Sequence, residues 1–158
     1  MLPLIFLLSL TSPLNALEKV GEAEFSVMFI DIYDIALYSQ TGSYNRDTDH
    51  YSLQIEYHRN VSAERLVELT VDQWEHLGAP ISDIQQYGPV LRELWPDVRK
   101  GDSLTIYVTP DNSEFFHNNR AIGSIDDPGF GKLFTDIWLS AKTSAPRIRE
   151  DLLGQGAN

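Results

Sequence analysis

The stretch that most constrains the fold is GEAEFSVMFIDIYDIALYSQ, residues 21–40, because it is the longest run with the character of β-strand throughout. In its first half apolar and polar residues alternate, which is typical of a strand with one buried and one exposed face. In its second half only Asp31 and Asp34 are charged, which indicates protein on both faces. We therefore predict that a hairpin turn or a bend near residues 29–31 pairs the two halves.

Further strands are predicted wherever the same alternation returns. A polar, turn-rich segment at 41–50 leads into a third strand at 51–58, and the period returns to two after Lys100-Gly101. The expected later strands are residues 103–108, then 115–120 and 121–125 after a turn at 109–114.

Two helices are predicted between the third and fourth strands. Residues 63–77 place apolar side chains on one face, with Ser62 as the N-cap and Gly78 as the stop signal. A second, shorter helix is expected within 81–95, and Gly88-Pro89 is expected to interrupt it.

Two more helices are predicted after the last strand. Asp127-Pro128 opens the first, which keeps the 3.6-residue spacing as far as Ala141. Ser144 is the expected cap of the second, residues 145–153. Strands and helices that are segregated in this way indicate an α+β fold, in which helices cover one antiparallel sheet.

The N-terminal residues 1–16, MLPLIFLLSLTSPLNA, have the apolar core, polar break and small final residue of a secretory signal peptide. Their apolar run of about ten residues is too short for a membrane-spanning helix, which needs roughly 20, so no stable membrane anchor is expected. The chain has no cysteine, which excludes a lipoprotein and disulfides. We therefore expect an exported, periplasmic domain over residues 17–158.

Charge limits the partners that this domain can bind. The formal net charge is −11, with 12 Lys and Arg against 23 Asp and Glu. Nucleic acid is therefore not an expected partner, because phosphate binding needs clustered cations. Anionic membrane surfaces are disfavoured for the same reason.

Four segments together resemble the bacterial exported chalcone isomerase-like family: IYDIALYS, EYHRNVS, LWPDVRKGDSL and DPGFGKLFTDIWLSAKTSAPRIREDLLG. The resemblance spans residues 21–154, and its C-terminal block is the most specific part. It implies the open-faced β-sandwich of chalcone isomerases, with a ligand cleft between a large antiparallel sheet and its helices. It does not imply the reaction.

Departures from the plant enzymes argue against chalcone cyclisation. The resemblance puts Tyr33 where those enzymes have a threonine, and their arginine falls at or near Gly21. Helix 63–77 contains neither the tyrosine nor the asparagine that they carry there. The groups that would bind the phenolate and polarise the ketone are therefore missing. No catalytic residue and no cofactor is assigned, and an enzyme is not the favoured interpretation.

Noncatalytic relatives of this family bind fatty acids, so the leading hypothesis is an exported protein that binds a small apolar or amphipathic ligand. Arg59 is a candidate to pair with a ligand carboxylate; the alternative is that it caps a helix or pairs with an acidic residue. Arg65 and Arg120 are the other cations near it in this interpretation.

Aromatic side chains on strands complete the candidate ligand site. Tyr33, Tyr38 and Tyr57 are positioned to direct hydroxyls into the cleft, although half-buried core tyrosines have the same pattern. Phe115 and Phe116 are adjacent on a strand and must point to opposite faces, so one of them meets the cleft, the helices or a partner. Phe115 is the candidate for the cleft.

Other chemistry-bearing residues do not converge. His50, His58, His76 and His117 lack the spacing of a metal site, so no metal is assigned. Two rival functions stay open: an isomerase or lyase on an unknown substrate, and an interaction module whose cleft is filled by its own side chains. The oligomeric state is not predicted.

Overall fold

A computed structural model describes residues 12–156 as six strands and four α-helices, preceded by a short 3₁₀ helix. The predicted signal peptide therefore lies largely outside the described residues. In chain order the elements are η1 (Pro13–Ala16), β1 (Glu18–Val27), β2 (Ile30–Ser39), β3 (Tyr51–Tyr57), α1 (Ala63–His76), α2 (Ile81–Leu94), β4 (Ser103–Val108), β5 (Ser113–His117), β6 (Arg120–Ile125), α3 (Phe130–Leu139) and α4 (Pro146–Leu152).

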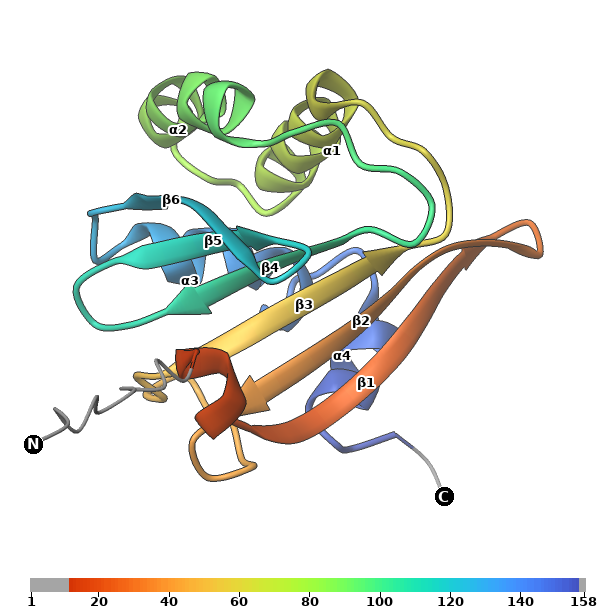
Figure 1. The fold of residues 1–158 in the computed structure, drawn as a ribbon, viewed down its shortest axis with the longest axis vertical. Helices are drawn as coiled ribbons and strands as arrows, with labels where there is room; N and C mark the ends of the chain where they lie inside the picture. The colour runs from red at the N-terminus through yellow and green to blue at the C-terminus, as the bar shows by residue number, and fades with distance from the viewer. Residues whose placement is uncertain (1–11, 157–158) are drawn as a thin grey trace, which may run out of the picture.

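The strands form one antiparallel sheet in the sequential order β1-β2-β3-β4-β5-β6 (Figure 1). The predicted hairpin between the two halves of residues 21–40 is confirmed, since β1 pairs with β2 along their length. Its turn lies at Met28 and Phe29, whose φ angles are 50° and 66°. Both angles are positive, as a tight type I′ hairpin turn requires.

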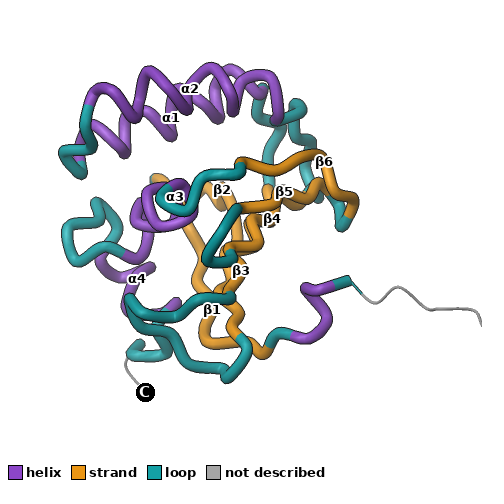
Figure 2. Tube along the Cα trace, turned by 90° about the vertical axis from the view of Figure 1, so that its left-hand side faces the viewer, coloured by secondary structure: helices purple, strands orange, loops and turns teal. Residues whose placement is uncertain are grey.

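All four α-helices lie on one side of the sheet, and η1 lies on the other (Figure 2). Helix α4 packs against β1, helix α3 contacts both α1 and α4, and α1 pairs with α2. This arrangement confirms the α+β class and the open sheet, one face of which is covered by helices. We call the helix-covered side the inner face and the opposite side the outer face.

Gly21 is the point of closest approach between β1 and α4. A Cβ atom at this position would collide with the backbone carbonyl oxygens of Asp151 and Leu152. The strand and the C-terminal helix therefore pack backbone to backbone, which only glycine allows here.

Two details of the predicted helices are wrong. Helix α2 is as long as α1, 14 residues, and continues through Pro89. Pro89 and Gln85, whose carbonyl loses its helical donor to the proline, are both exposed, so water can replace the missing hydrogen bond. Ser144 does not cap α4: the N-cap residue is Ala145, and Ser144 instead donates a hydrogen bond to Gln73 on α1.

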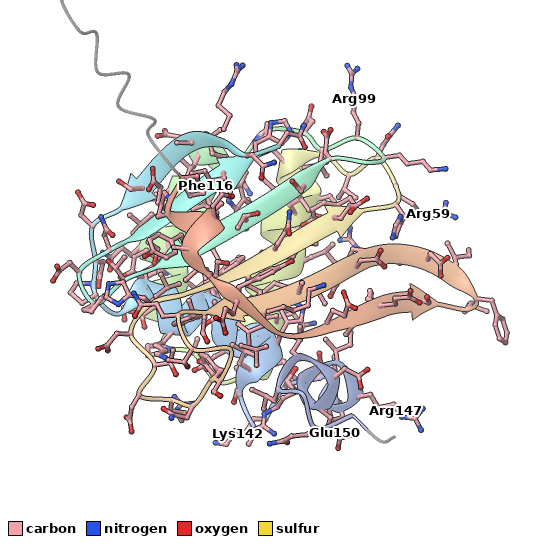
Figure 3. All side chains as sticks on the ribbon, turned by 60° about the horizontal axis from the view of Figure 1, so that its bottom comes forward. Arg59, Arg99, Phe116, Lys142, Arg147 and Glu150 are labelled. Carbon is pink, nitrogen blue, oxygen red and sulfur yellow. The ribbon has the colours of Figure 1, made fainter. Side chains whose placement is uncertain are left out.

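The core lies between the inner face and the helices. Phe115 is buried in it, whereas Phe116 is buried on the outer face, so the predicted opposition of these neighbours is confirmed (Figure 3). No helix within residues 12–156 has the length and hydrophobicity needed to span a bilayer.

Candidate ligand cavity

A cavity of about 200 Å³ lies between the inner face of the sheet and helices α1 and α3. Its walls are almost entirely apolar and aromatic. They come from β1 to β5, α1, α3 and the segments beside them, and include Phe25, Ile32, Leu53, Ile55, Leu66, Leu104, Ile106, Phe134 and Ile137. Apolar cavities with a few polar groups are the usual form of small-molecule sites.

Two tyrosines supply polar atoms to the wall. Tyr33 and Tyr57 are opposite each other on β2 and β3, with ring centroids 6.1 Å apart. The Tyr33 hydroxyl accepts a hydrogen bond from Trp138 Nε1 at 2.9 Å, which leaves its own proton free to donate. The Tyr57 hydroxyl has no hydrogen-bond partner among residues 12–156.

Burial keeps both hydroxyls protonated. It raises the pKa of Tyr33 to about 12. Burial also raises the pKa of Tyr57, and the nearby Tyr33 hydroxyl raises it further. Both groups are therefore neutral hydrogen-bond donors at physiological pH.

The cavity reaches the surface between α1 and the loop that leads to α4. Leu69 on α1 lines the cavity and is 42% exposed. Beside it, Ser144 Oγ donates to Gln73 Oε1 at 2.6 Å, and both residues also line the cavity. This hydrogen bond joins the two sides of the opening.

Trp95 adds an unusual polar atom to the wall. Its ring lines the cavity and packs edge-on against Phe115 and Phe134, with centroids 5.6 Å and 5.7 Å apart. Its buried Nε1 has no acceptor among the described residues. A buried donor without a partner destabilises the protein by about 1–3 kcal/mol. The sequence indicated only a packing role for Trp95, and likewise gave no sign that Leu69 or Gln73 borders an opening.

The structure brings together three of the five predicted ligand-site residues. Tyr33, Tyr57 and Phe115 line the cavity. Tyr38 does not, because it lies on the outer face, where the Lys19 ammonium is 5.9 Å from its ring centroid. Arg59 is exposed, outside the cavity wall, and its side chain projects away from the body (Figure 3). The geometry therefore does not place Arg59 where it could bind a ligand carboxylate in this cavity.

Charged groups are absent from this wall and form separate clusters elsewhere. None of the residues that line the cavity in the described chain is Asp, Glu, His, Lys or Arg. Asp102 accepts hydrogen bonds from Asn118 and a ring nitrogen of His117, and these bonds hold its pKa at about 2. No group of three or more potential metal ligands occurs among residues 12–156.

The sequence matches the chalcone isomerase-like family over residues 17–154. The chain belongs to this family. The match covers the whole sheet and all four helices, so the family and the fold predicted from the sequence are confirmed.

Two similar proteins place this family member in context. An uncharacterized protein of Haemophilus influenzae is 24% identical over 144 residues, which is 91% of this chain and 71% of that protein. The crystal structure of an Arabidopsis thaliana fatty-acid binding protein superposes with a TM-score of 0.64 at 10% identity, covering 88% of this chain and 87% of that one. At this identity, the second likeness concerns the fold.

Proposed function

We propose that this protein is an exported, noncatalytic chalcone isomerase-like protein that binds a small apolar or amphipathic ligand, such as a fatty acid. The observation that carries the proposal is the apolar cavity of about 200 Å³ in an otherwise closely packed core, with its opening at Leu69. Core packing normally leaves few voids larger than a water molecule. The fatty-acid binding protein of the same fold supports the ligand class.

Because the described wall carries no charged side chain, it determines how an amphipathic ligand lies in the cavity. A carboxylate buried without a cation or several donors is strongly destabilised. No Lys or Arg of the described chain lines the cavity, whereas Gln73 and Ser144 lie at its opening. The apolar chain therefore occupies the interior and the carboxylate stays at the opening, where water and these two side chains solvate it.

Two features support a noncatalytic role and export. General acid–base catalysis needs a group that titrates near the working pH, and the described wall contains only tyrosines among titratable residues. The N-terminal leader pattern at residues 1–16 supports export.

Decanoate binding to the mature protein tests this function by native mass spectrometry and calorimetry. Leu69→Trp fills the opening and is expected to weaken decanoate binding by about tenfold, equivalent to roughly 1.4 kcal/mol. Val90→Trp is the matched control, because Val90 lies on α2, is 40% exposed and does not line the cavity. It is expected to bind like the wild type.

The test also separates the rival functions. A wild-type protein that takes up neither decanoate nor a neutral analogue of the same length would favour an interaction module. Turnover of an added ligand would favour an isomerase or lyase. Equal weakening in the two tryptophan variants would show that binding is not at this cavity.

A further inference from the structure

The turn between β1 and β2 is the most exposed apolar segment among the described residues. Met28 is 86% exposed and Phe29 is 104% exposed, and Val27 and Ile30 beside them are also exposed. The hairpin extends beyond the end of β3, so its tip stands away from the rest of the sheet (Figure 1). Neither side chain at the tip contributes to the core.

A second hairpin in the same protein shows that the fold does not require apolar residues in this turn. The turn between β5 and β6 consists of Asn118 and Asn119, with φ angles of 49° and 65°. These angles are almost the same as those of Met28 and Phe29, 50° and 66°. Asparagine tolerates this left-handed conformation, whereas Met and Phe are disfavoured in it. Met28 and Phe29 therefore reduce stability, and they make no core contacts that would offset the loss. We take this as a sign that the two side chains serve binding and not folding.

Cations without acidic partners surround the same end of the sheet. Arg59 follows β3, and Arg99 and Lys100 precede β4; all three are exposed, and none forms a salt bridge within residues 12–156. Backbone hydrogen bonds tie the two loops together, with Gly101 N donating to Tyr57 O at 2.8 Å. Figure 3 shows Arg59 and Arg99 projecting outward from these loops.

Acidic side chains also lie at this end, and several of them have partners other than these cations, among them Asp34, which is 3.0 Å from His58 Nε2. Asp31 accepts a hydrogen bond from Ser26 at 2.8 Å, and Asp97 accepts one from the backbone of Ala63 at the start of α1. A protein with a net charge of −11 thus presents three cations without a salt bridge beside an apolar tip, together with the carboxylates of Asp31 and Asp34.

We propose that this end of the sheet docks on the surface of an anionic phospholipid bilayer. Met28 and Phe29 insert between the lipid headgroups, and Arg59, Arg99 and Lys100 pair with lipid phosphates. An apolar tip beside basic side chains matches the layered chemistry of a bilayer surface. The net charge of the whole chain disfavours anionic membranes, so docking is confined to the one orientation in which these three cations and the apolar tip face the bilayer.

A lipid surface fits the tip better than a protein partner does. Stable protein interfaces bury about 800 Å² on each partner around a well-packed centre, whereas this tip is a narrow projection with two prominent apolar side chains. A bilayer accepts such a projection without needing a complementary pocket. Docking is independent of the proposed ligand, although Phe25 and Ile32 of the cavity wall belong to the same hairpin.

The apolar half of the docking surface is tested by sedimentation of the mature protein with vesicles of phosphatidylcholine, with and without phosphatidylglycerol. The double variant Met28→Asn/Phe29→Gly gives the turn the residues that its geometry favours. It is expected to bind the mixed vesicles at least about tenfold more weakly, while its melting temperature rises. Because this variant is expected to be more stable than the wild type, unfolding does not explain a loss of binding.

The basic side chains of the docking surface are tested with two double variants, each of which removes two positive charges. Arg59→Ala/Arg99→Ala is expected to weaken binding to mixed vesicles by about thirtyfold, from roughly fivefold for each cation near an anionic surface. Lys142→Ala/Arg147→Ala removes two exposed cations, one just before α4 and one on it, neither of them in the loops of the docking surface, and is expected to bind like the wild type.

Three outcomes would overturn the proposal. They are a wild-type protein that ignores phosphatidylglycerol, a hairpin variant that binds as the wild type does, and equal losses in the two charge variants. None of these outcomes bears on decanoate binding, so the proposal for the cavity and the proposal for the docking surface are tested independently.

Discussion

The two halves of the inner face are built differently although they belong to one sheet. Among the inner-face residues that do not line the cavity, side chains fill the space: the ring centroid of Phe130 lies 5.0 Å from that of Tyr87. The residues that line the cavity, among them Tyr33 and Tyr57, border empty space instead. We call these the filled half and the hollow half.

With the proposed ligand site in the hollow half, one fold would separate stability from binding. The filled half gains dispersion contacts on every side of its rings, and the hollow half gives up such contacts where the cavity begins. Substitutions in the filled half should therefore change stability and leave binding intact. Substitutions in the hollow half should do the reverse.

The largest effect is expected in the filled half. Phe130 is fully buried and does not line the cavity. Phe130→Ala should lower the free energy of unfolding by about 3–5 kcal/mol, because it removes a buried ring and leaves a void. Urea unfolding measures this change. A loss below about 1 kcal/mol would mean that the filled half is not the main source of stability.

A matched pair of tyrosines should sharpen the contrast. The buried Tyr51 hydroxyl donates to Thr135 Oγ1 at 2.9 Å, and Thr135 in turn donates to the carbonyl of Gly131. Tyr51→Phe should therefore reduce stability by about 1–1.5 kcal/mol. Tyr57→Phe should change stability by less than about 0.5 kcal/mol, since its hydroxyl has no partner in the described chain.

Chemical denaturation of both phenylalanine variants measures this difference. If Tyr57→Phe were the more destabilising of the two, the hydroxyl of Tyr57 would have a structural role, and the hollow half would not be specialised for a ligand.

Acid should affect the stability of the sheet through Asp102, which precedes β4 and contacts His117 on β5. Hydrogen bonds, first of all from Asn118, lower the pKa of Asp102 from 3.8 to about 2. A carboxyl group with a lowered pKa in the folded state stabilises the protein above pH 3.8, and this contribution is lost as the pH falls towards 2.

The variant Asp102→Asn should therefore be less stable than the wild type at pH 5, and the difference should shrink between pH 4 and pH 2. Thermal unfolding across that range measures it. A difference that does not change with pH would show that the carboxylate charge of Asp102 is not what stabilises this end of the sheet.

The smallest effect on stability is expected at the opening of the hollow half. Ser144→Ala removes the exposed hydrogen bond to Gln73 and should change the free energy of unfolding by less than about 0.5 kcal/mol. Because the bond joins the two sides of the opening, decanoate should dissociate faster. Stopped-flow dilution measures the rate; an unchanged rate would mean that the ligand leaves by another route.

Periodicity predicted the sheet because burial and side-chain alternation are coupled in strands. It placed the hairpin, and it put Phe115 and Phe116 on opposite faces. The same rule excludes Tyr38 from the site of Tyr33, because two strand residues five positions apart face opposite ways. The prediction that Pro89 interrupts α2 was wrong because a proline removes only one local hydrogen bond. The helix continues because it packs against α1.

The cavity itself was beyond the reach of a single sequence. A void depends on how side chains from several elements fail to meet, which no local pattern records. Arg59 lies two residues beyond the end of β3, so its direction is set by the loop and not by the strand. Trp95 occupies an ordinary core position, and only its missing hydrogen-bond acceptor distinguishes it.

The close packing of α4 on Gly21 marks a difference between this chain and the plant enzymes that it resembles. The resemblance drawn from the sequence puts the arginine of the plant enzymes at or near this position, where any side chain would collide with the backbone of Asp151 and Leu152. An arginine at position 21 therefore fits only if the C-terminal helix first moves away from β1. The docking of α4 thus decides which side chains this position can carry.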